Sequence, residues 1–402
     1  MTTIQDSQAA AGRAPAPAAA IGAPSGGRVW TPARRRLLLI ILATKAATFL
    51  VALAVLRFVP CFNSGEYQKD IHWPREGPPT LATSFATWDA AHYLFLSEAG
   101  YTPGTPSCAF YPLWPWLIRA FARSTHLTHF AAGLILANLF SVAGLVGFHY
   151  LVASFHGLPT ANTSTALLLA YPGAFYFSFI YTESLFFLLI VLFFLFLIQG
   201  RYVCLAFTGL LLPLTKAIGI LCLVPILFHA LGNGRRSRAL LLAYYATFLG
   251  YGCYFLCMWR ATGNAFEGFE AQRFFPNQPS LAHLVDPAGF LARFFMPVRL
   301  HGMVDSAIDR AAFVALLASL YWTYKLDRRY FAYSCLAGVV PAVSSCLLSY
   351  TRNLMMCFPL FIVGGSWFAR PGRGFSLWFT ILILATLQVW FLLRHINFVW
   401  VA

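Results

Sequence analysis

Residues 34–59 read RRRLLLIILATKAATFLVALAVLRFV, three arginines followed by an almost unbroken apolar run. A helix that spans a membrane needs about 20 consecutive, mostly apolar residues, and arginines beside one end of it favour the cytoplasmic side. This stretch therefore predicts a first transmembrane helix whose N-terminus lies in the cytoplasm. It also sets the direction in which each later segment crosses the membrane.

The composition extends this prediction to the whole chain. Of the 402 residues, 59% are hydrophobic and only 10% are charged, and the mean hydropathy is +0.68. Soluble domains carry about 25% charged residues. Because apolar runs of membrane-spanning length recur along the sequence, we predict an all-α polytopic membrane protein.

The apolar segments together predict a bundle of about 11 transmembrane helices. Two of them share the run 203–231, which Pro213 and Lys216 interrupt and which arginines flank on both sides. We expect two short arms that meet near Lys216. Because such arms are too short to cross about 30 Å of lipid, we place Lys216 at depth, in a polar cavity open to the outside. The other spans are expected at about 129–155, 164–180, 184–199, 238–259, 307–325, 330–349, 354–369 and 375–393.

The net charge of +15 reflects this topology, because the basic residues cluster at the ends of apolar runs. The clusters lie at 34–36, 235–238, 325–329 and 370–373, and the expected spans place all of them on the cytoplasmic side. We therefore expect these residues to meet membrane lipids and no nucleic acid.

The chain divides into a tail and one membrane domain. Residues 1–33 are rich in Ala, Pro, Gly and Ser, and we expect them to form a disordered cytoplasmic tail. Residues 34–402 are expected to form a single transmembrane domain with large outer loops at about 60–128 and 260–305.

The first outer loop should contain short interfacial helices, over 84–99 and 110–121, because the second of these stretches is aromatic and amphipathic. Cys61 and Cys108 bound the polar part of the same loop. They could pair if the loop faces an oxidising compartment.

This loop also holds an acid and an imidazole among aromatic side chains, in the run Thr87-Trp88-Asp89-Ala90-Ala91-His92-Tyr93. Trp88 and Tyr93 suit the membrane–water boundary, and an Asp beside them would be partly desolvated and a better proton acceptor. The alternative for Asp89 is the N-cap of a short helix. His92 could bind a substrate or donate to a carboxylate, or its role could be structural.

Three further charged residues stand on the outer side of the expected topology. Glu183 follows one apolar run and begins another, where an acid is a functional candidate or an ordinary interfacial residue. Lys216 and Arg352 suggest an anionic ligand such as a phosphate. The alternative for both is a cation that reaches lipid headgroups, which is the role we expect for Arg119 and Arg123.

Motifs for metal or nucleotide binding are missing from the sequence, which has no HExxH, no DxD pair, no Walker motif and no GxGxxG. We expect no metal and no cofactor. A group-transfer reaction without a nucleotide site would draw on a membrane-borne donor.

Two blocks of sequence carry a family resemblance. Residues 88–94 (Trp88-Asp89-Ala90-Ala91-His92-Tyr93-Leu94) run to Gly100-Tyr101, and residues 109–115 follow as AFYPLWP. The second block reads YPGAFYFS at 171–178, continued by YTESL at 181–185. Both resemble the GPI mannosyltransferase II (PIG-V-type) family and its bacterial relatives. Weaker blocks at 259–264, and at Arg352 before 358–360, extend the likeness over about residues 85–362.

The resemblance implies a GT-C glycosyltransferase that moves mannose from a polyprenyl-phosphate donor to an acceptor hydroxyl on the extracytoplasmic side, with inversion. It implies that Asp89 is the catalytic base. Lys216 stands where Arg-Pro is expected in relatives, and Asn353 where Tyr is expected. The residues that we expect to bind substrates are Trp88, His92, Tyr93, Glu183, Lys216 and Arg352.

The expected partners follow from the same likeness. They are a polyprenyl-phosphate-linked sugar as co-substrate and a glycan or lipid acceptor, and there is room for a small membrane subunit. The tail and the lack of an organelle signal favour a bacterial inner membrane over the endoplasmic reticulum. The alternative functions are a lipid-linked sugar transporter or flippase without transferase activity, and a non-catalytic subunit that holds a partner.

Overall fold

The structure is a computed structural model that describes residues 32–58, 72–74, 80–233, 237–276, 278–303 and 305–401. Within these residues the chain is helical, and isolated β-bridges are its only extended pairings. The expected cytoplasmic tail and Cys61 lie outside the described residues, so the tail and the Cys61–Cys108 pairing stay predictions. The α-helices are α1 (Pro32–Phe58), α3 (Leu81–Phe85), α4 (Asp89–Glu98), α5 (Leu113–Thr125), α6 (His129–His156), α7 (Leu158–Ala170), α8 (Glu183–Gln199), α9 (Tyr202–Thr215), α10 (Leu223–Asn233), α11 (Arg238–Thr262), α12 (Glu267–Glu270), α13 (Pro287–Phe294), α14 (Ala307–Leu326), α15 (Arg328–Ser344), α16 (Tyr350–Leu354), α17 (Pro359–Phe368) and α18 (Gly374–Ile396). The 3-10 helices are η1 (Pro106–Ala109), η2 (Ala174–Ser178), η3 (Ala217–Cys222), η4 (Ala271–Phe274) and η5 (Leu281–Val285).

The apolar helices confirm the prediction of an all-α polytopic membrane protein. Four helices in the described part of the chain, α1, α6, α11 and α18, are long and apolar enough to cross a membrane. Shorter apolar helices include α8, α9 and α17. Each apolar run expected from the sequence corresponds to one of the helices, and the ends of several of them differ from the expected ones.

The largest differences lie where the chain returns toward the centre of the bundle. The span expected over 164–180 ends at Ala170, because Tyr171-Pro172-Gly173 interrupts α7, and residues 174–178 form η2. The span expected over 330–349 ends at Ser344. Residues 171–187 are all buried, and residues 345–349 are buried or partly buried. Non-helical backbone is tolerated at membrane depth under that condition.

The run 203–231 breaks as its sequence predicts. α9 contains Pro213 and ends at Thr215, Lys216 is extended with φ −152°, and η3 and α10 follow. The turn is tight, because a Cβ atom on Gly219 would lie 2.3 Å from the Leu212 carbonyl carbon. α11 packs closely along α9, where Gly250 leaves room for the Leu210 carbonyl.

The first outer loop folds into two short helices where one was expected. α3 and α4 are separated at Ala86-Thr87-Trp88, and Trp88 has φ 56°. α5 packs against α4, and Arg119 donates from Nε to the Ser97 carbonyl at 2.7 Å. The lipid-headgroup role expected for Arg119 is therefore wrong, because its guanidinium binds carbonyl groups at the end of α4.

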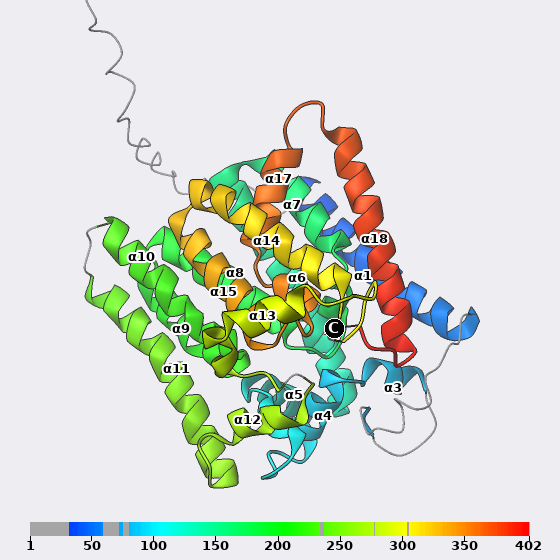
Figure 1. The fold of residues 1–402 in the computed structure, drawn as a ribbon, viewed down its shortest axis with the longest axis vertical. Coiled ribbons are helices and arrows are strands. Elements are labelled where there is room, and N and C mark those ends of the chain that lie inside the picture. Colours follow the sequence, from blue (N-terminus) through cyan, green and yellow to red (C-terminus); the bar gives the residue numbers. More distant parts are fainter. Residues whose placement is uncertain are drawn as a thin grey trace, which may run out of the picture.

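The short helices gather at one end of the bundle. α4, α5 and α12 lie together there, and the connections from α14 to α15 and from α17 to α18 lie at the opposite end (Figure 1). The second outer loop, which contains α12, η4, η5 and α13, runs over the ends of the longer helices (Figure 1). Residues from both outer loops line one cavity.

Candidate functional site

Asp89 begins α4 and faces an arginine from the far end of the chain. Its Oδ2 atom accepts a hydrogen bond from Nη2 of Arg352 at 2.6 Å. The helix has no side-chain cap: Trp88 is the N-cap residue, and Asp89 is already helical. The capping alternative therefore does not describe Asp89, whose carboxylate serves a contact between distant segments.

Asp89 and Arg352 belong to a chain of four alternating charges. Oε1 of Glu183, the first residue of α8, lies 3.2 Å from Nε of Arg352. The same oxygen accepts a hydrogen bond from Nζ of Lys216 at 2.7 Å. We call Asp89, Arg352, Glu183 and Lys216 the charge quartet. It has no formal net charge, because two carboxylates balance two cations.

The side chains of the charge quartet differ in their exposure. The Glu183 side chain is 1% exposed and that of Arg352 is 10% exposed, whereas Asp89 retains 23%. Glu183 is thus the buried counter-ion, and Asp89 is the carboxylate that a second molecule can reach. Buried charges require paired partners, and the interfacial and lipid-headgroup alternatives for Glu183 and Arg352 do not fit this burial.

Two aromatic rings lie against the guanidinium of Arg352. Its guanidinium carbon lies 5.5 Å from the centre of the Tyr176 ring and 5.4 Å from that of Tyr181. Burial disfavours the charged guanidinium, but the Asp89 and Glu183 carboxylates outweigh that effect and raise the pKa of Arg352 well above its ordinary value. Arg352 therefore stays charged.

The residue before Arg352 is tied to α14. Oδ1 of Asp309 accepts hydrogen bonds from the backbone nitrogen of Thr351 at 2.6 Å and from its Oγ1 at 2.5 Å. Asp309 is itself almost fully buried, at 3% exposure. These bonds set the position of α16 and, with it, the direction in which Arg352 points.

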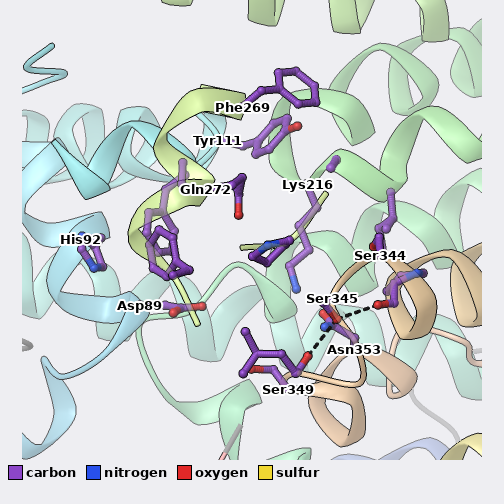
Figure 2. A pocket seen from close by; sticks show the side chains of 18 of the residues that line it. Asp89, His92, Tyr111, Lys216, Phe269, Gln272, Ser344, Ser345, Ser349 and Asn353 are labelled. Atoms are coloured by element: carbon purple, nitrogen blue, oxygen red, sulfur yellow. Dashed lines mark hydrogen bonds between the residues drawn. The ribbon is translucent and has the colours of Figure 1, made fainter. Parts of the chain in front are cut away.

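The quartet opens onto a cavity of about 1520 Å³. Asp89 and Lys216 extend into this cavity from different sides, and Tyr111, Phe269 and Gln272 form another part of its wall (Figure 2). One region of the lining is aromatic and another is polar. The lining residues from the quartet and its surroundings are Trp88, Asp89, His92, Tyr93, Lys216 and Arg352, joined by Ser344, Ser345, Ser349 and Asn353.

Three further residues expected at the site line the same cavity. Nδ1 of His92 is 2.9 Å from the Ser107 hydroxyl, and its ring stacks on Phe110. The hydroxyl of Tyr93 lies 3.2 Å from that of Thr182. Burial, with the negative charges of Asp89 and Glu183, raises the pKa of Tyr93 well above its ordinary value, so this phenol stays protonated.

Trp88 is the third of these expected residues that line the cavity. Its indole packs edge-on against Trp400, with ring centres 5.1 Å apart. Its Nε1 atom is buried and has no hydrogen-bond partner among the described residues. The structure thus places six of the seven site residues expected from the sequence along one cavity, and the seventh, Glu183, lies buried behind Arg352 and Lys216.

Several cavity residues had no signal in the sequence that marked them. Ser344 ends α15, Ser345 and Ser349 follow it, and Gln272 comes from the second outer loop. Serines after an apolar run are read as an ordinary helix end. The sequence did mark position 353, because it holds Asn where Tyr is expected in relatives.

The expectation of no metal and no cofactor stays a prediction. In the part of the chain that the structure describes, no group of three or more His, Cys, Asp or Glu side chains is placed to hold a metal ion.

Comparison with protein-family models and with curated protein sequences gives no match. Among solved structures, similar chains include an Archaeoglobus fulgidus oligosaccharyltransferase with zinc and sulfate (12% identity, TM-score 0.47) and in the apo form (14%, 0.46). A third is the archaeal oligosaccharyltransferase AglB from the same organism, with an inhibitory peptide and a dolichol-phosphate (10%, 0.42). Each alignment covers 89% of this chain and 53%, 56% and 55% of the respective structures, so this chain spans about half their length. At these TM-scores the likeness supports no argument about chemistry, which has to come from the chain's own residues.

Proposed function

We propose that this helical membrane protein is a glycosyltransferase of the GT-C type. It would move a hexose, mannose by the sequence resemblance, from a polyprenyl-phosphate donor to an acceptor hydroxyl on the extracytoplasmic side. The observation that carries the proposal is the Asp89 carboxylate, which opens onto a large cavity beside Lys216. A transferase needs a base and a cation in one such space.

Asp89 is the proposed base. Arg352 holds its Oδ2 atom, and no described residue forms a hydrogen bond to Oδ1, so Oδ1 is available to an acceptor hydroxyl. In the proposed step the acceptor oxygen attacks the anomeric carbon while Asp89 takes its proton. The bond from the anomeric carbon to the phosphate oxygen breaks, and the polyprenyl phosphate leaves with the electron pair. Attack from the face opposite the phosphate inverts the anomeric centre.

Lys216 is the proposed partner of the departing phosphate. A phosphate leaving group needs positive charge to stabilise it and no proton donor. Nζ of Lys216 carries three donors, of which one is used by Glu183. Nη1 of Arg352 has no hydrogen-bond partner among the described residues. Glu183 pairs with both cations until an anionic donor arrives, a role that differs from the substrate binding expected for it.

His92, Trp88 and Tyr93 form the proposed wall beside Asp89, where they would orient the substrates. The proposed partners are a polyprenyl-phosphate sugar, a glycan or lipid acceptor, and membrane lipids. The proposal also leaves room for a small membrane subunit. The proposed location is a bacterial inner membrane, with the N-terminus in the cytoplasm. The basic α14–α15 and α17–α18 connections, which lie opposite the short helices of the site, support this orientation (Figure 1).

The test uses the purified protein in detergent, with polyprenyl-phosphate-[14C]mannose and a membrane extract as the source of acceptors. The proposal predicts release of polyprenyl phosphate and transfer of the label to acceptor, and slow transfer to water without extract. A flippase moves lipid across proteoliposomes without breaking the sugar–phosphate bond. Lipid movement with an intact donor would replace the transferase proposal by that alternative.

A further inference from the structure

A strained turn follows α15 and forms one side of the cavity. Cys346, Leu347 and Ser349 all have positive φ, at 52°, 65° and 55°. Left-handed backbone is unfavourable for residues other than glycine, and such residues persist where the surrounding structure holds them. We call residues 344–349 the strained turn. Three such residues in so short a segment point to a role beyond joining α15 to α16.

The second outer loop holds the strained turn in place. The backbone nitrogen of Ser280 donates to the Ser344 carbonyl at 3.0 Å, and Nδ1 of His283 lies 2.8 Å from the same oxygen. Nη1 of Arg293 donates to Sγ of Cys346 at 2.6 Å. Contacts from η5 and α13 therefore fix a conformation that the turn would not adopt alone.

The effect of this conformation is to direct polar side chains into the cavity. Ser344, Ser349 and Asn353 line it, and none of their side chains has a hydrogen-bond partner among the described residues. Figure 2 shows Ser344, Ser345, Ser349 and Asn353 grouped on one side, with the Lys216 side chain reaching toward them and Asp89 across the cavity. Unused hydroxyl and amide groups on a fixed wall are suited to bind a ligand that is rich in hydroxyl groups.

We propose that Ser349 and Asn353, presented by the strained turn and α16, bind the hydroxyl groups of the donor's sugar ring and select it. This inference rests on the proposed function. If Lys216 binds the donor phosphate, the sugar must lie beside Lys216, because its anomeric carbon is one oxygen away from phosphorus. Asn353 also follows Arg352, which holds the proposed base. The wall thus orients the anomeric carbon toward Asp89.

The test compares two lipids on the full chain in nanodiscs: polyprenyl-phosphate-mannose and polyprenyl phosphate without sugar. Ser349→Gly removes the hydroxyl and also relieves the positive φ, so it should not lower the melting temperature. We expect this variant and Asn353→Leu each to weaken binding of the mannosyl lipid by roughly three- to tenfold, the effect of one lost hydrogen bond. Binding of polyprenyl phosphate should be unchanged.

Lys216→Met is the matched control, since it should weaken binding of both lipids. Unchanged affinity for the mannosyl lipid in Ser349→Gly and Asn353→Leu would overturn the inference and leave the proposed function standing. So would an effect confined to the KM of the acceptor, which would place the acceptor's hydroxyl groups at this wall. If the wild-type protein binds neither lipid, the proposed function fails and the inference fails with it.

Discussion

Two lysines in this bundle, one buried and one partly buried, differ in how completely the protein uses their donors. Lys45 lies in the middle of α1, 7% exposed, and Lys216 lies between α9 and η3. Nζ of Lys45 donates to the Asn138 side chain at 3.1 Å, to the Phe177 carbonyl at 3.0 Å and to the Ser178 hydroxyl at 3.3 Å. The space beside it measures only about 10 Å³.

Lys216 differs from Lys45 both in its hydrogen-bond partners and in the size of the space beside it. It has one hydrogen-bonded partner, the Glu183 carboxylate, and it borders a cavity of about 1520 Å³. The donors of Lys45 are fully used by the protein, whereas Lys216 keeps donors for a second molecule. Burial of a lysine in a membrane helix therefore does not identify a site. Unused donors beside an open space are the basis of the role proposed for Lys216.

The largest effect is expected from breaking the quartet at its centre. Arg352→Gln leaves the buried Glu183 with one cation and Asp89 with none, and removal of one partner from buried ion pairs costs about 3–5 kcal/mol. We expect a clear fall in the melting temperature, measured in detergent, and loss of sugar transfer. Arg352→Lys, which keeps the charge, should lose less stability. An unchanged melting temperature in Arg352→Gln would show that the quartet does not stabilise the fold.

The two lysines themselves give the next test. Lys216→Met should lower the rate of transfer by roughly 10²–10³-fold, the usual cost of removing one group that stabilises developing charge. Lys45→Met leaves buried acceptors without a donor and should cost about 1–3 kcal/mol of stability. Its transfer rate, per folded molecule, should stay near that of the wild type. Equal losses of activity in the two variants would remove the distinction between the lysines.

A smaller effect is expected at Asp309, which acts on the site through Thr351. Asp309→Ala leaves the Thr351 amide without its acceptor and loosens α16. We expect kcat to fall roughly tenfold with little change in donor KM, because the reacting groups lose their orientation. Asp309→Asn retains one oxygen acceptor and should restore most of the rate. A rise in donor KM at constant kcat would instead place Asp309 in donor binding.

The sequence predicts the helices better than it predicts the contacts between them. Apolar length and charge placement locate the spans, and Pro213 with Lys216 marks the break in 203–231. These are local signals. The bond between Asp89 and Arg352 joins residues 263 positions apart, and no pattern within a single segment indicates which acid a distant arginine will meet.

Other features of the site also depend on tertiary structure. Cys346 and Leu347 adopt positive φ in a turn that the second outer loop contacts at Ser344 and Cys346, and neither residue type favours that conformation. Lys45 lies within an apolar run and reads as part of a helix, although its three acceptors come from α6 and η2. Six of the residues that line the cavity could be proposed from the sequence. Their pairing could not.

The most direct test of the central claim is a single-turnover measurement on Asp89→Asn with bound polyprenyl-phosphate-mannose. The substitution keeps the shape of the side chain and removes the proton acceptor. We predict that the rate of sugar transfer falls by roughly 10²–10⁴-fold, the usual contribution of general-base catalysis, while donor binding persists. A rate close to that of the wild type, in protein that is folded and loaded with donor, would contradict the assignment of Asp89 as the base.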